Sequence, residues 1–394
     1  MLVILDAFIA GQRIHPRERK ASLVKNVLIV GGCGFVGSHT ADALLELGHR
    51  VTIFDNLCCQ VHGGEFPTYV SPEAEFIDGD VRDLASLSAA VHGRDVIYNL
   101  AAAVGVGQSM YEIAAYTATN IQGTANLLQA ILDTKSLPEK IIVASSMSIY
   151  GEGRYLCPSC GDIAPEPRSA AQLKNKNWET RCPQCGVTAQ PAATDETKPL
   201  HCTSIYALSK KAQEEMTLVF GRTYDIPTVA LRYFNIYGSR QALSNPYTGV
   251  AAIFASRLMN GKSPVMFEDG FQLRDFVNVQ DVVRANLLAM SGRGGDGMAL
   301  NVGSGEPVSI RQIATEIASM FGLCVPMEIS GRYRAGDIRH CYADISKVSQ
   351  TLGYRPRVAL REGMTELVEW LRSQRAHDRS EEAMQHLAAR GLVA

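Results

Sequence analysis

The segment Val27–Gly37 (VLIVGGCGFVG) decides the fold of this 394-residue chain. A short apolar run leads into a turn with glycine at positions 31, 34 and 37, and residues 35–47 follow with helical periodicity. Glycines let such a turn be tight and let the backbone approach a pyrophosphate, while free N–H groups at the helix N-terminus attract negative charge. Asp55 ends the next apolar run, where a carboxylate accepts hydrogen bonds from an adenosine ribose and repels a 2′-phosphate. The segment therefore predicts a dinucleotide site that favours NAD over NADP; the alternative is a purely structural strand–turn–helix unit.

Short apolar runs alternate with helix-length segments along the rest of the chain. The runs predicted as strands are 27–30, 51–54, 75–77, 96–100, 141–144 and 228–231. The segments predicted as helices are 35–47, 84–91, 114–132, 205–222, 250–259, 279–290, 310–321 and 381–390. Short strands that alternate with longer helices predict a parallel sheet with helices on both faces. The fold class is therefore α/β, a Rossmann-type doubly wound parallel sheet with a smaller mixed C-terminal domain for substrate.

The composition is that of a globular protein with a sizeable core, since hydrophobic residues make up 46% and charged residues 20%. Lys and Arg number 38 against 40 Asp and Glu, which removes the electrostatic basis for binding nucleic acid or an anionic membrane. No apolar run approaches the roughly 18 residues of a transmembrane helix. The first 25 residues place an apolar stretch before the basic HPRERK segment, the reverse of an export signal. We therefore expect a cytoplasmic protein.

These patterns divide the chain into four parts. Residues 1–25 are expected to be an N-terminal extension, and 26–238 an NAD-binding domain. Residues 152–200 interrupt that domain with a Pro-, Gly- and Cys-rich insertion that shows no convincing periodicity and looks too polar for a core of its own. Residues 239–371 are expected to bind substrate and to return in part to the sheet, and 372–394 to form a C-terminal tail.

Tyr206 and Lys210 lie four residues apart on a predicted helix and therefore share one face. A phenol with a pKa near 10 is a poor base at neutral pH, but a neighbouring ammonium and the cationic ring of oxidised NAD would stabilise the phenolate. Lowering that pKa by about three units requires roughly 4 kcal/mol. Ser145 and Ser146 follow the strand 141–144, and hydroxyls at the carboxyl end of a central strand point into the ligand crevice.

Residues after the third and fourth strands are further candidates for the cofactor site. Asp80, in the GDVRD turn, is placed to bond an adenine amino group. Residues 99–102 are small enough for their backbone to lie against the cofactor. Both segments could equally be ordinary strand ends, so their assignment depends on the Gly-rich turn.

The order of these motifs resembles the extended short-chain dehydrogenases/reductases, which include the nucleotide-sugar epimerases and dehydratases. The resemblance covers about residues 26–371 and rests, beyond the motifs above, on 145–151 (SSMSIYG), 232–238 (RYFNIYG), 274–279 (RDFVNV) and 334–337 (RAGD). It implies that Ser146, Tyr206 and Lys210 are catalytic. The cofactor contacts that it implies are Gly31, Gly34, Phe35, Val36, Gly37, Asp55, Asn56, Asp80, Val81, Leu100, Ala101, Ala102, Asn120, Tyr206, Lys210 and Tyr233.

The same resemblance implies a set of substrate contacts. Ser146 and Asn235 would lie by the sugar, Arg274 and Arg334 would hold the diphosphate, and Asp337 would bind the nucleotide ribose. Surface salt bridging is the alternative role for the two arginines.

The residues after Ser146 bear on the reaction. The 4,6-dehydratases that this sequence resembles carry Asp-Glu there, and the nucleotide-sugar decarboxylases usually carry Glu at the second position. Here the positions hold Met147 and Ser148, which cannot act as that acid and base at neutral pH. Enzymes that epimerise at C3 and C5 use a cysteine in this segment, and it has none. What remains is epimerisation at C4 through a transient 4-keto sugar. In that mechanism Tyr206 removes the C4 hydroxyl proton as hydride passes to NAD, and hydride then returns to the other face.

Four of the ten cysteines form two C-P-x-C-G turns, Cys157/Cys160 and Cys182/Cys185, with 21 residues between them. This spacing indicates a tetrahedral structural zinc site, and two disulfides, an iron–sulfur site or a redox site are the alternatives. Residues 151–200 hold six Lys/Arg and six Asp/Glu, so this zinc ribbon lacks the basic stripe of a nucleic-acid binder. A Cys₄ insertion at this location resembles a bacterial subgroup of dTDP-L-rhamnose 4-epimerase-like proteins.

Other functions stay open at this point. They are a UDP-hexose or hexuronate 4-epimerase, a dehydratase or decarboxylase with atypical acid/base groups, and a catalytically silent binding scaffold. The family resemblance also implies a homodimer through the helices around 111–132 and 204–222.

Overall fold

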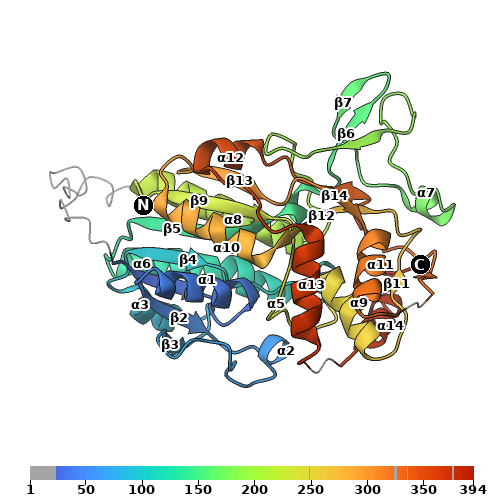
Figure 1. Ribbon diagram of the computed structural model, residues 1–394. Helices are drawn as coiled ribbons and strands as arrows, with labels where there is room; N and C mark the ends of the chain where they lie inside the picture. The colour runs from blue at the N-terminus through green and yellow to red at the C-terminus, as the bar shows by residue number, and fades with distance from the viewer. Residues whose placement is uncertain (1–23, 248, 324–325, 335, 375–376) are drawn as a thin grey trace.

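The computed structural model describes residues 24–394 except 248, 324–325, 335 and 375–376, so the predicted N-terminal extension lies almost wholly outside it (Figure 1). Its centre is a seven-stranded sheet with the order β3-β2-β1-β4-β5-β9-β13, in which every neighbouring pair is parallel. The strands are β1 (Asn26–Val30), β2 (Arg50–Asp55), β3 (Glu75–Asp78), β4 (Val96–Asn99), β5 (Lys140–Ser146), β9 (Thr228–Tyr233) and β13 (Met298–Val302).

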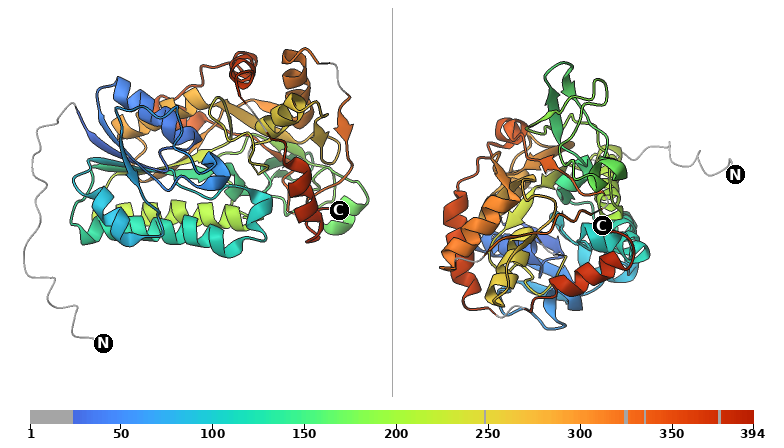
Figure 2. Two further views of the ribbon diagram at one scale, coloured as in Figure 1. Left: turned by 90° about the horizontal axis from the view of Figure 1, so that it is seen from below. Right: turned by 90° about the vertical axis from the view of Figure 1, so that its right-hand side faces the viewer.

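Helices cover both faces of this sheet, as Figure 2 shows. One face carries α1 (Phe35–Glu46), α10 (Val279–Ser291) and α12 (Ser346–Leu352), and the other carries α3 (Leu84–Val91), α6 (Gly123–Asp133) and α8 (Ile205–Tyr224). Successive residues of the central strands feed two separate apolar clusters: Val27 and Ile29 pack on the α1 face, Leu28 and Val30 on the α3 face. Because both faces are buried, the strands read as continuous apolar runs. The predicted doubly wound α/β fold is confirmed.

The order of the strands reverses between β1 and β4. The chain runs from β1 outward through β2 to β3, and then restarts at β4 on the other side of β1. In open parallel sheets, the crevice at such a reversal, outside the carboxyl ends of the strands, is where ligands bind. The Gly-rich turn after β1 and Ser146 at the end of β5 both lie at this edge.

The predicted helix 114–132 is interrupted. The structure has a short α5 (Ile113–Tyr116), a π-helical segment (Thr117–Gln122) and then α6. Within the π segment, the buried Asn120 directs its side chain onto the backbone of Ala103. Such π segments insert an extra residue and occur often at functional sites, and apolar periodicity alone cannot reveal them.

Residues after Tyr233 build a second apolar core beside the sheet, and they also return to the sheet through α10 and β13. The strands in this part are β10 (Asn235–Tyr237), β11 (Val265–Met266), β12 (Leu273–Asn278), β14 (Pro307–Ser309), β15 (Glu328–Ile329) and β16 (His340–Cys341). The helices are α9 (Val250–Met259), α11 (Ile310–Met320), α13 (Leu360–Leu371) and α14 (Ser380–Ala388). The C-terminal residues dock on the body, because Leu387 is buried and Val393 forms a β-bridge with Arg334.

The insertion projects from one corner of the molecule, between β5 and α8 (Figure 1). It contains a three-stranded antiparallel sheet, β7-β6-β8, with β6 (Arg154–Cys157), β7 (Gly161–Ile163) and β8 (Gln190–Ala192), and a short α7 (Ala170–Lys174). The expectation that it lacks a core is wrong. Tyr155, Ile163 and Ala189 are buried together with two of the cysteines. The sequence does not indicate this core because it is small and because cysteine side chains, rather than a periodic run of aliphatic residues, make up its centre.

Among the described helices, none is both long enough and apolar enough to span a bilayer. The remaining short helices are α2 (Cys59–His62), α4 (Val106–Ser109) and a 3₁₀ turn (Met147–Tyr150).

Candidate active site

The Gly-rich turn packs closely against itself and against the loop after β4. Gly31 has φ +82°, and a Cβ there would lie 2.7 Å from the Ala101 backbone; one on Gly37 would lie 2.3 Å from the Gly31 carbonyl oxygen. These two glycines are therefore required by packing of the turn itself. Gly34 differs, because a Cβ there would meet only the Gly31 oxygen, at 3.3 Å. Gly34 is the N-cap of α1 and has no side chain that could accept a hydrogen bond. The first N–H groups of the helix, at Phe35 and Val36, are therefore not capped by a side chain.

Asp55 lies beside this turn. Its carboxylate accepts hydrogen bonds from the backbone N–H groups of Cys33 and Leu57, each at 3.0 Å, and His62 Nε2 lies 3.8 Å from it. Burial raises the pKa of Asp55, and His62 and the backbone donors act in the opposite direction. These donors fix the carboxylate at the end of β2, and its remaining lone pairs could accept ribose hydroxyls. The sequence places His62 in the loop after Asp55 but indicates no role for it, because that loop carries no periodic pattern or motif.

The two candidates after β3, Asp80 and Val81, are held by neighbouring side chains, one of which is the candidate Asn56. Asp80 accepts from Arg82 Nε at 2.8 Å and from Asn56 Nδ2 at 2.9 Å, and the Arg82 side chain holds the pKa of Asp80 well below its usual range. Because the Asp80 carboxylate already pairs with the Arg82 guanidinium, Asp80 stabilises the turn after β3 whether or not it also contacts adenine. Val81 is buried, and its carbonyl accepts from Asn126 Nδ2 at 3.0 Å.

The loop after β4 lies against the Gly-rich turn, through the close approach of Ala101 to Gly31. Leu100, Ala101 and Ala102 are half-buried there. Asn120 is fully buried, and its amide bonds both backbone groups of Ala103 and also Ser209 Oγ at 2.8 Å. Asn120 thus ties this loop to α8 and positions it, and its hydrogen-bonding groups face protein.

The three predicted catalytic residues come from two adjacent elements. Ser146 ends β5, and Tyr206 and Lys210 lie on the first turns of α8, which packs on β5. Ser204 caps α8 by accepting from the Ala207 N–H, and the Tyr206 N–H donates to Ser109 Oγ at 3.0 Å. The helix start, and with it the Tyr206 ring, is therefore fixed from two sides.

The protonation of the site is governed by burial. Burial raises the pKa of Tyr206, and its hydrogen bond with Ser146 lowers it in part. Burial lowers the pKa of Lys210 to about 7, and the nearby Glu214 opposes this. Both burial effects favour the neutral phenol and the neutral amine, so the phenolate that the sequence predicts requires further positive charge in the site.

Two supporting residues on α8 were not predicted. Lys210 Nζ donates to Gln213 Oε1 at 2.9 Å, and Glu214 accepts from Ser145 Oγ at 2.6 Å and from Arg232 Nη2 at 2.6 Å. Their spacing from Lys210, three and four residues, places them on the same helix face. That periodicity was the available signal for them.

Three of the predicted substrate residues, Arg274, Arg334 and Asp337, lie close together although Arg274 is 60 positions or more from the other two in the sequence. Asp337 lies 3.6 Å from Arg274 and 3.7 Å from Arg334, and the Arg334 guanidinium also lies 4.1 Å from the centre of the Phe267 ring. Gly336 in the same loop approaches Thr203, so a Cβ there would be 2.9 Å from the Thr203 carbonyl oxygen. The loop therefore adjoins the start of α8, which carries Tyr206.

Asn235, predicted to contact the sugar, and Tyr233, predicted to contact the cofactor, differ in how their side chains are used. Asn235 Oδ1 is buried and has no hydrogen-bond partner. A buried unsatisfied oxygen is destabilising unless a ligand or water donates to it, so it is a fitting contact for a sugar or nucleotide. The Tyr233 hydroxyl instead donates to Asn286 Oδ1 at 2.6 Å, which anchors its ring in the core under the sheet.

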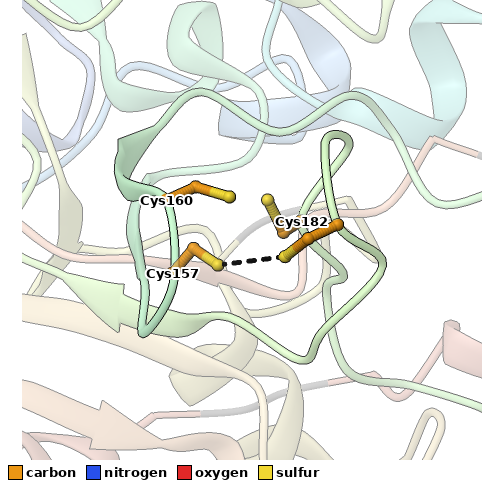
Figure 3. Close-up of side chains that lie close together, drawn as sticks. Cys157, Cys160 and Cys182 are labelled. Atoms are coloured by element: carbon orange, nitrogen blue, oxygen red, sulfur yellow. Dashed lines mark hydrogen bonds between the residues drawn. The ribbon is translucent and has the colours of Figure 1, made fainter.

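The four cysteines of the insertion converge, as Figure 3 shows for Cys157, Cys160 and Cys182. All four sulfur atoms, Cys185 included, lie within 4.8 Å of one another, and the Cys157 and Cys185 Sγ atoms are 3.4 Å apart. Sulfur atoms around a tetrahedral zinc ion, at about 2.3 Å from it, are about 3.8 Å apart. The predicted cysteine set is thus brought together with spacings that fit such an ion.

A doubly wound sheet with a glycine-rich turn, a carboxylate at the end of β2 and a Ser–Tyr–Lys set at the sheet edge defines a nucleotide-dependent enzyme of the short-chain dehydrogenase/reductase class. Residues 27–170 and 182–303 match the NAD dependent epimerase/dehydratase family. The chain belongs to that family.

Comparisons with individual proteins agree with this membership. The chain is 35% identical over 358 residues to dTDP-L-rhamnose 4-epimerase of Burkholderia thailandensis, covering 89% of this chain and 96% of that one. Among solved structures it resembles UDP-glucose 4-epimerase of Thermotoga maritima with UDP-glucose (TM-score 0.72, 29% identity, 88% and 98% of the two chains). It also resembles the UDP-glucose 4-epimerase of Thermus thermophilus with NAD (TM-score 0.70, 28% identity, 89% and 100%).

Proposed function

We propose that this chain epimerises a nucleotide-activated sugar at C4, with NAD as a resident cofactor. The observation that carries this proposal is the surroundings of Ser146. Ser148 donates to the Ser146 hydroxyl from its own hydroxyl, at 3.0 Å, and from its backbone N–H, at 3.2 Å. The position at which related dehydratases and decarboxylases carry a carboxylate therefore holds a neutral hydroxyl that orients Ser146. Hydride removal and return need no further acid or base there.

The residues of this chain take the following parts. Tyr206 accepts the proton of the C4 hydroxyl and later returns it, and Ser146 donates a hydrogen bond to the C4 oxygen as it becomes a ketone. Bound NAD supplies the hydride acceptor, and its cationic ring favours the phenolate form of Tyr206. Lys210 contributes positive charge near the phenol when it is protonated, and Gln213 holds its ammonium in place.

The two arginines and Asp337 fit a nucleoside diphosphate. Arg334 offers a guanidinium group for a diphosphate, and Arg274 adds positive charge beside it while its Nη atoms donate to the carbonyls of Leu273, Ile338 and Arg339. Asp337 between them can accept from ribose hydroxyls. By similarity to its 35% identical relative, we propose a dTDP-L-rhamnose-like deoxysugar nucleotide as substrate, with UDP-hexose or hexuronate as the alternative.

We further propose that the cysteine cluster holds a structural zinc ion, with Cys157, Cys160, Cys182 and Cys185 as ligands. Four thiolates give a closed coordination shell, so the ion would staple the insertion and take no part in the chemistry. A four-cysteine metal site fits a reducing compartment, and we propose the cytoplasm as the location.

A homodimer is supported by an apolar face. The α8 side chains of Leu208 and Val219 are each 51% exposed, and Ile113 on the adjacent α5 is 49% exposed. These residues form a surface on the two helices that we propose to pack against the same helices of a second copy.

The test is to incubate the purified NAD-loaded protein with a set of dTDP- and UDP-sugars and to follow the sugar C4 configuration by NMR. We expect one substrate to reach an equilibrium with its C4 epimer. Formation of a 4-keto-6-deoxy sugar would identify a dehydratase, and loss of a carboxyl group from a uronate a decarboxylase. A protein that retains NAD and turns over none of the sugars would instead be a binding scaffold.

A further inference from the structure

A buried network of charges joins the zinc insertion to the C-terminal part of the chain. Arg168, in the insertion, pairs with Glu268 at 2.8 Å, and the side chains are 2% and 1% exposed. Arg339, which precedes β16, pairs with the same Glu268 at 3.0 Å and is 1% exposed. One carboxylate thus bridges two guanidinium groups that come from opposite sides of the contact.

The insertion contributes a second connection through Glu179. Its carboxylate accepts from Arg339 Nη2 at 2.6 Å and lies 3.2 Å from His340 Nε2. Glu152, where the insertion begins, accepts from the backbone N–H groups of Arg339, at 2.8 Å, and His340, at 3.2 Å. Two residues of the insertion therefore contact residues 339–340 directly, and Arg168 reaches Arg339 through their shared partner Glu268.

What these contacts hold is the loop that carries Asp337. Arg168 Nη2 donates to the carbonyl oxygen of Asp337 at 3.1 Å. The next two carbonyls, those of Ile338 and Arg339, accept from the Arg274 guanidinium at 2.6 and 3.0 Å. The insertion and the candidate diphosphate-binding Arg274 thus fix three successive carbonyls of one loop, and this loop adjoins the start of α8.

Stability alone gives little reason for such a network. Removing charged groups from water is destabilising by several kcal/mol per ion, and buried ion pairs often stabilise a fold no more than apolar residues of similar size. Their pairing does, however, demand one geometry, because a displaced partner leaves a buried charge unpaired. A charged contact that is rigid in this way suits a surface whose position matters for a ligand.

We propose that the insertion is a brace for the nucleotide-sugar site, in which Arg168 and Glu179 are positioning residues that set the affinity for the nucleoside diphosphate moiety through the 337–339 loop. This inference rests on the proposed function, since it takes Arg274 and Asp337 as substrate contacts. It assigns the insertion a role in substrate binding that its cysteines alone do not indicate. Neither residue is assigned a contact with substrate or cofactor.

Glu179→Gln is the variant of choice, because Glu179 is 43% exposed and its replacement keeps the side-chain shape. We expect KM for the sugar nucleotide to rise about tenfold, within the usual range of coupling between sites. The value of kcat should stay within about twofold and bound NAD should be unchanged, since Tyr206, Ser146 and the Gly-rich turn are untouched. Glu179→Asp, which restores the charge, should recover part of the loss, and Arg168→Lys should behave like Glu179→Gln.

The matched control is Arg154→Gln. Arg154 is also in the insertion and pairs with Asp162 at 3.0 Å and Asp195 at 3.6 Å, all within the insertion. Its loss removes two ion pairs without touching the 337–339 loop, so KM should not change.

Calorimetric titration with dTDP and with UDP provides a readout that does not depend on turnover. If the wild type binds one of them but turns over no sugar, the epimerase assignment fails while the brace is still measurable as weaker nucleotide binding in Glu179→Gln. Unchanged KM and nucleotide affinity in Glu179→Gln and Arg168→Lys would overturn the brace. So would equal effects in Arg154→Gln, or a loss confined to kcat. A wild type that binds neither nucleotide contradicts both proposals.

Discussion

Lys210 Nζ donates a hydrogen bond to Gln213 Oε1 at 2.9 Å, and the two side chains are 3% and 1% exposed. Gln213 Nε2 donates in turn to Thr124 Oγ1 at 2.9 Å, beside the loop after β4. The amine is thus fixed at the sheet edge without a carboxylate as its direct partner. Burial therefore dominates its titration, and the first prediction follows from that titration.

The Lys210→Met variant should be more stable than the wild type by an amount that depends on pH. The unfolded chain keeps the ammonium up to a pKa of about 10.4, whereas the folded, cofactor-free chain releases the proton at about 7. Between these values the unfolded state binds more protons, so Lys210 destabilises the fold increasingly as pH falls from about 10.4 to about 7 and no further below. We expect a gain of roughly 3–5 kcal/mol at pH 7 that shrinks toward pH 10. Urea unfolding at several pH values measures it.

Lys211→Met is the matched control for this prediction. Lys211 is the next residue on α8, is partly exposed, and pairs with the exposed Glu215 at 3.6 Å. Its replacement removes only this exposed ion pair and should change the free energy of unfolding by less than about 1 kcal/mol. A Lys210→Met gain that does not shrink between pH 7 and pH 10 would contradict the burial argument.

Tyr206→Phe should lower kcat by about two to four orders of magnitude, because the variant has no hydroxyl to exchange a proton with the C4 oxygen. Bound NAD should remain, since the ring and the Gly-rich turn are intact. Tyr224→Phe, at the exposed end of the same helix, is the control and should be fully active. Near-normal turnover in Tyr206→Phe would exclude the assigned role.

Alanine variants of the adjacent residues Ser145 and Ser146 should differ: one should mainly lower the stability of the fold, and the other should mainly lower kcat. Ser146→Ala removes the donor for the developing ketone and should lower kcat by about 100-fold. Ser145→Ala removes the 2.6 Å hydrogen bond to buried Glu214 and should lower the free energy of unfolding by about 1–3 kcal/mol with a much smaller change in kcat. Kinetics and urea unfolding of both variants test this. The reverse assignment would show that Ser145 faces the substrate.

Gly34→Ala should fold and lose NAD. Its φ of −69° suits alanine, and the new Cβ meets only one oxygen, at 3.3 Å, so the melting temperature should change little. The methyl group would instead occupy space beside the uncapped N-terminus of α1, where we place the pyrophosphate. The ratio of bound NAD to protein should fall at least about tenfold. Gly37→Ala is the contrast, because its Cβ would lie 2.3 Å from the Gly31 oxygen and should destabilise the fold itself.

The sequence predicts the large sheet well for a physical reason. Strands buried on both faces are continuous apolar runs, and a helix with one buried face is periodic. The predicted bounds 84–91 therefore match α3, which packs on the sheet, and 250–259 match α9, which packs in the second core. The π segment around Asn120 could not be predicted, because apolar periodicity does not register a single inserted residue and the bond from Asn120 to Ala103, across 17 residues, leaves no periodic trace. The substrate residues could be named only by resemblance, since no local pattern places Arg274 beside Asp337.

The charged brace was beyond sequence reasoning for a different reason. Arg168, Glu179, Glu268 and Arg339 each look like ordinary surface charges in their own segments, and equal numbers of each sign in the insertion suggest a solvated surface. Only the folded contact shows that Arg168 and Glu268 are almost fully buried. Whether a charged side chain can be buried depends on where its partner lies in the fold. Arg168 and Glu268 are 100 residues apart, so no local sequence pattern shows that they pair.

Cys157→Ser should remove the metal and loosen the insertion while the NAD site stays intact. We expect about one zinc ion per chain in the wild type and a large loss in the variant, measured by elemental analysis, because a closed site needs all four thiolates. Limited proteolysis should then cut within residues 151–200, since the small core around Tyr155 and Ile163 depends on the cysteine cluster. Cys202→Ser, whose thiol lies outside the cluster, is the control and should keep the metal. Iron in place of zinc, or two disulfides found by mass spectrometry under non-reducing conditions, would exclude the structural zinc site.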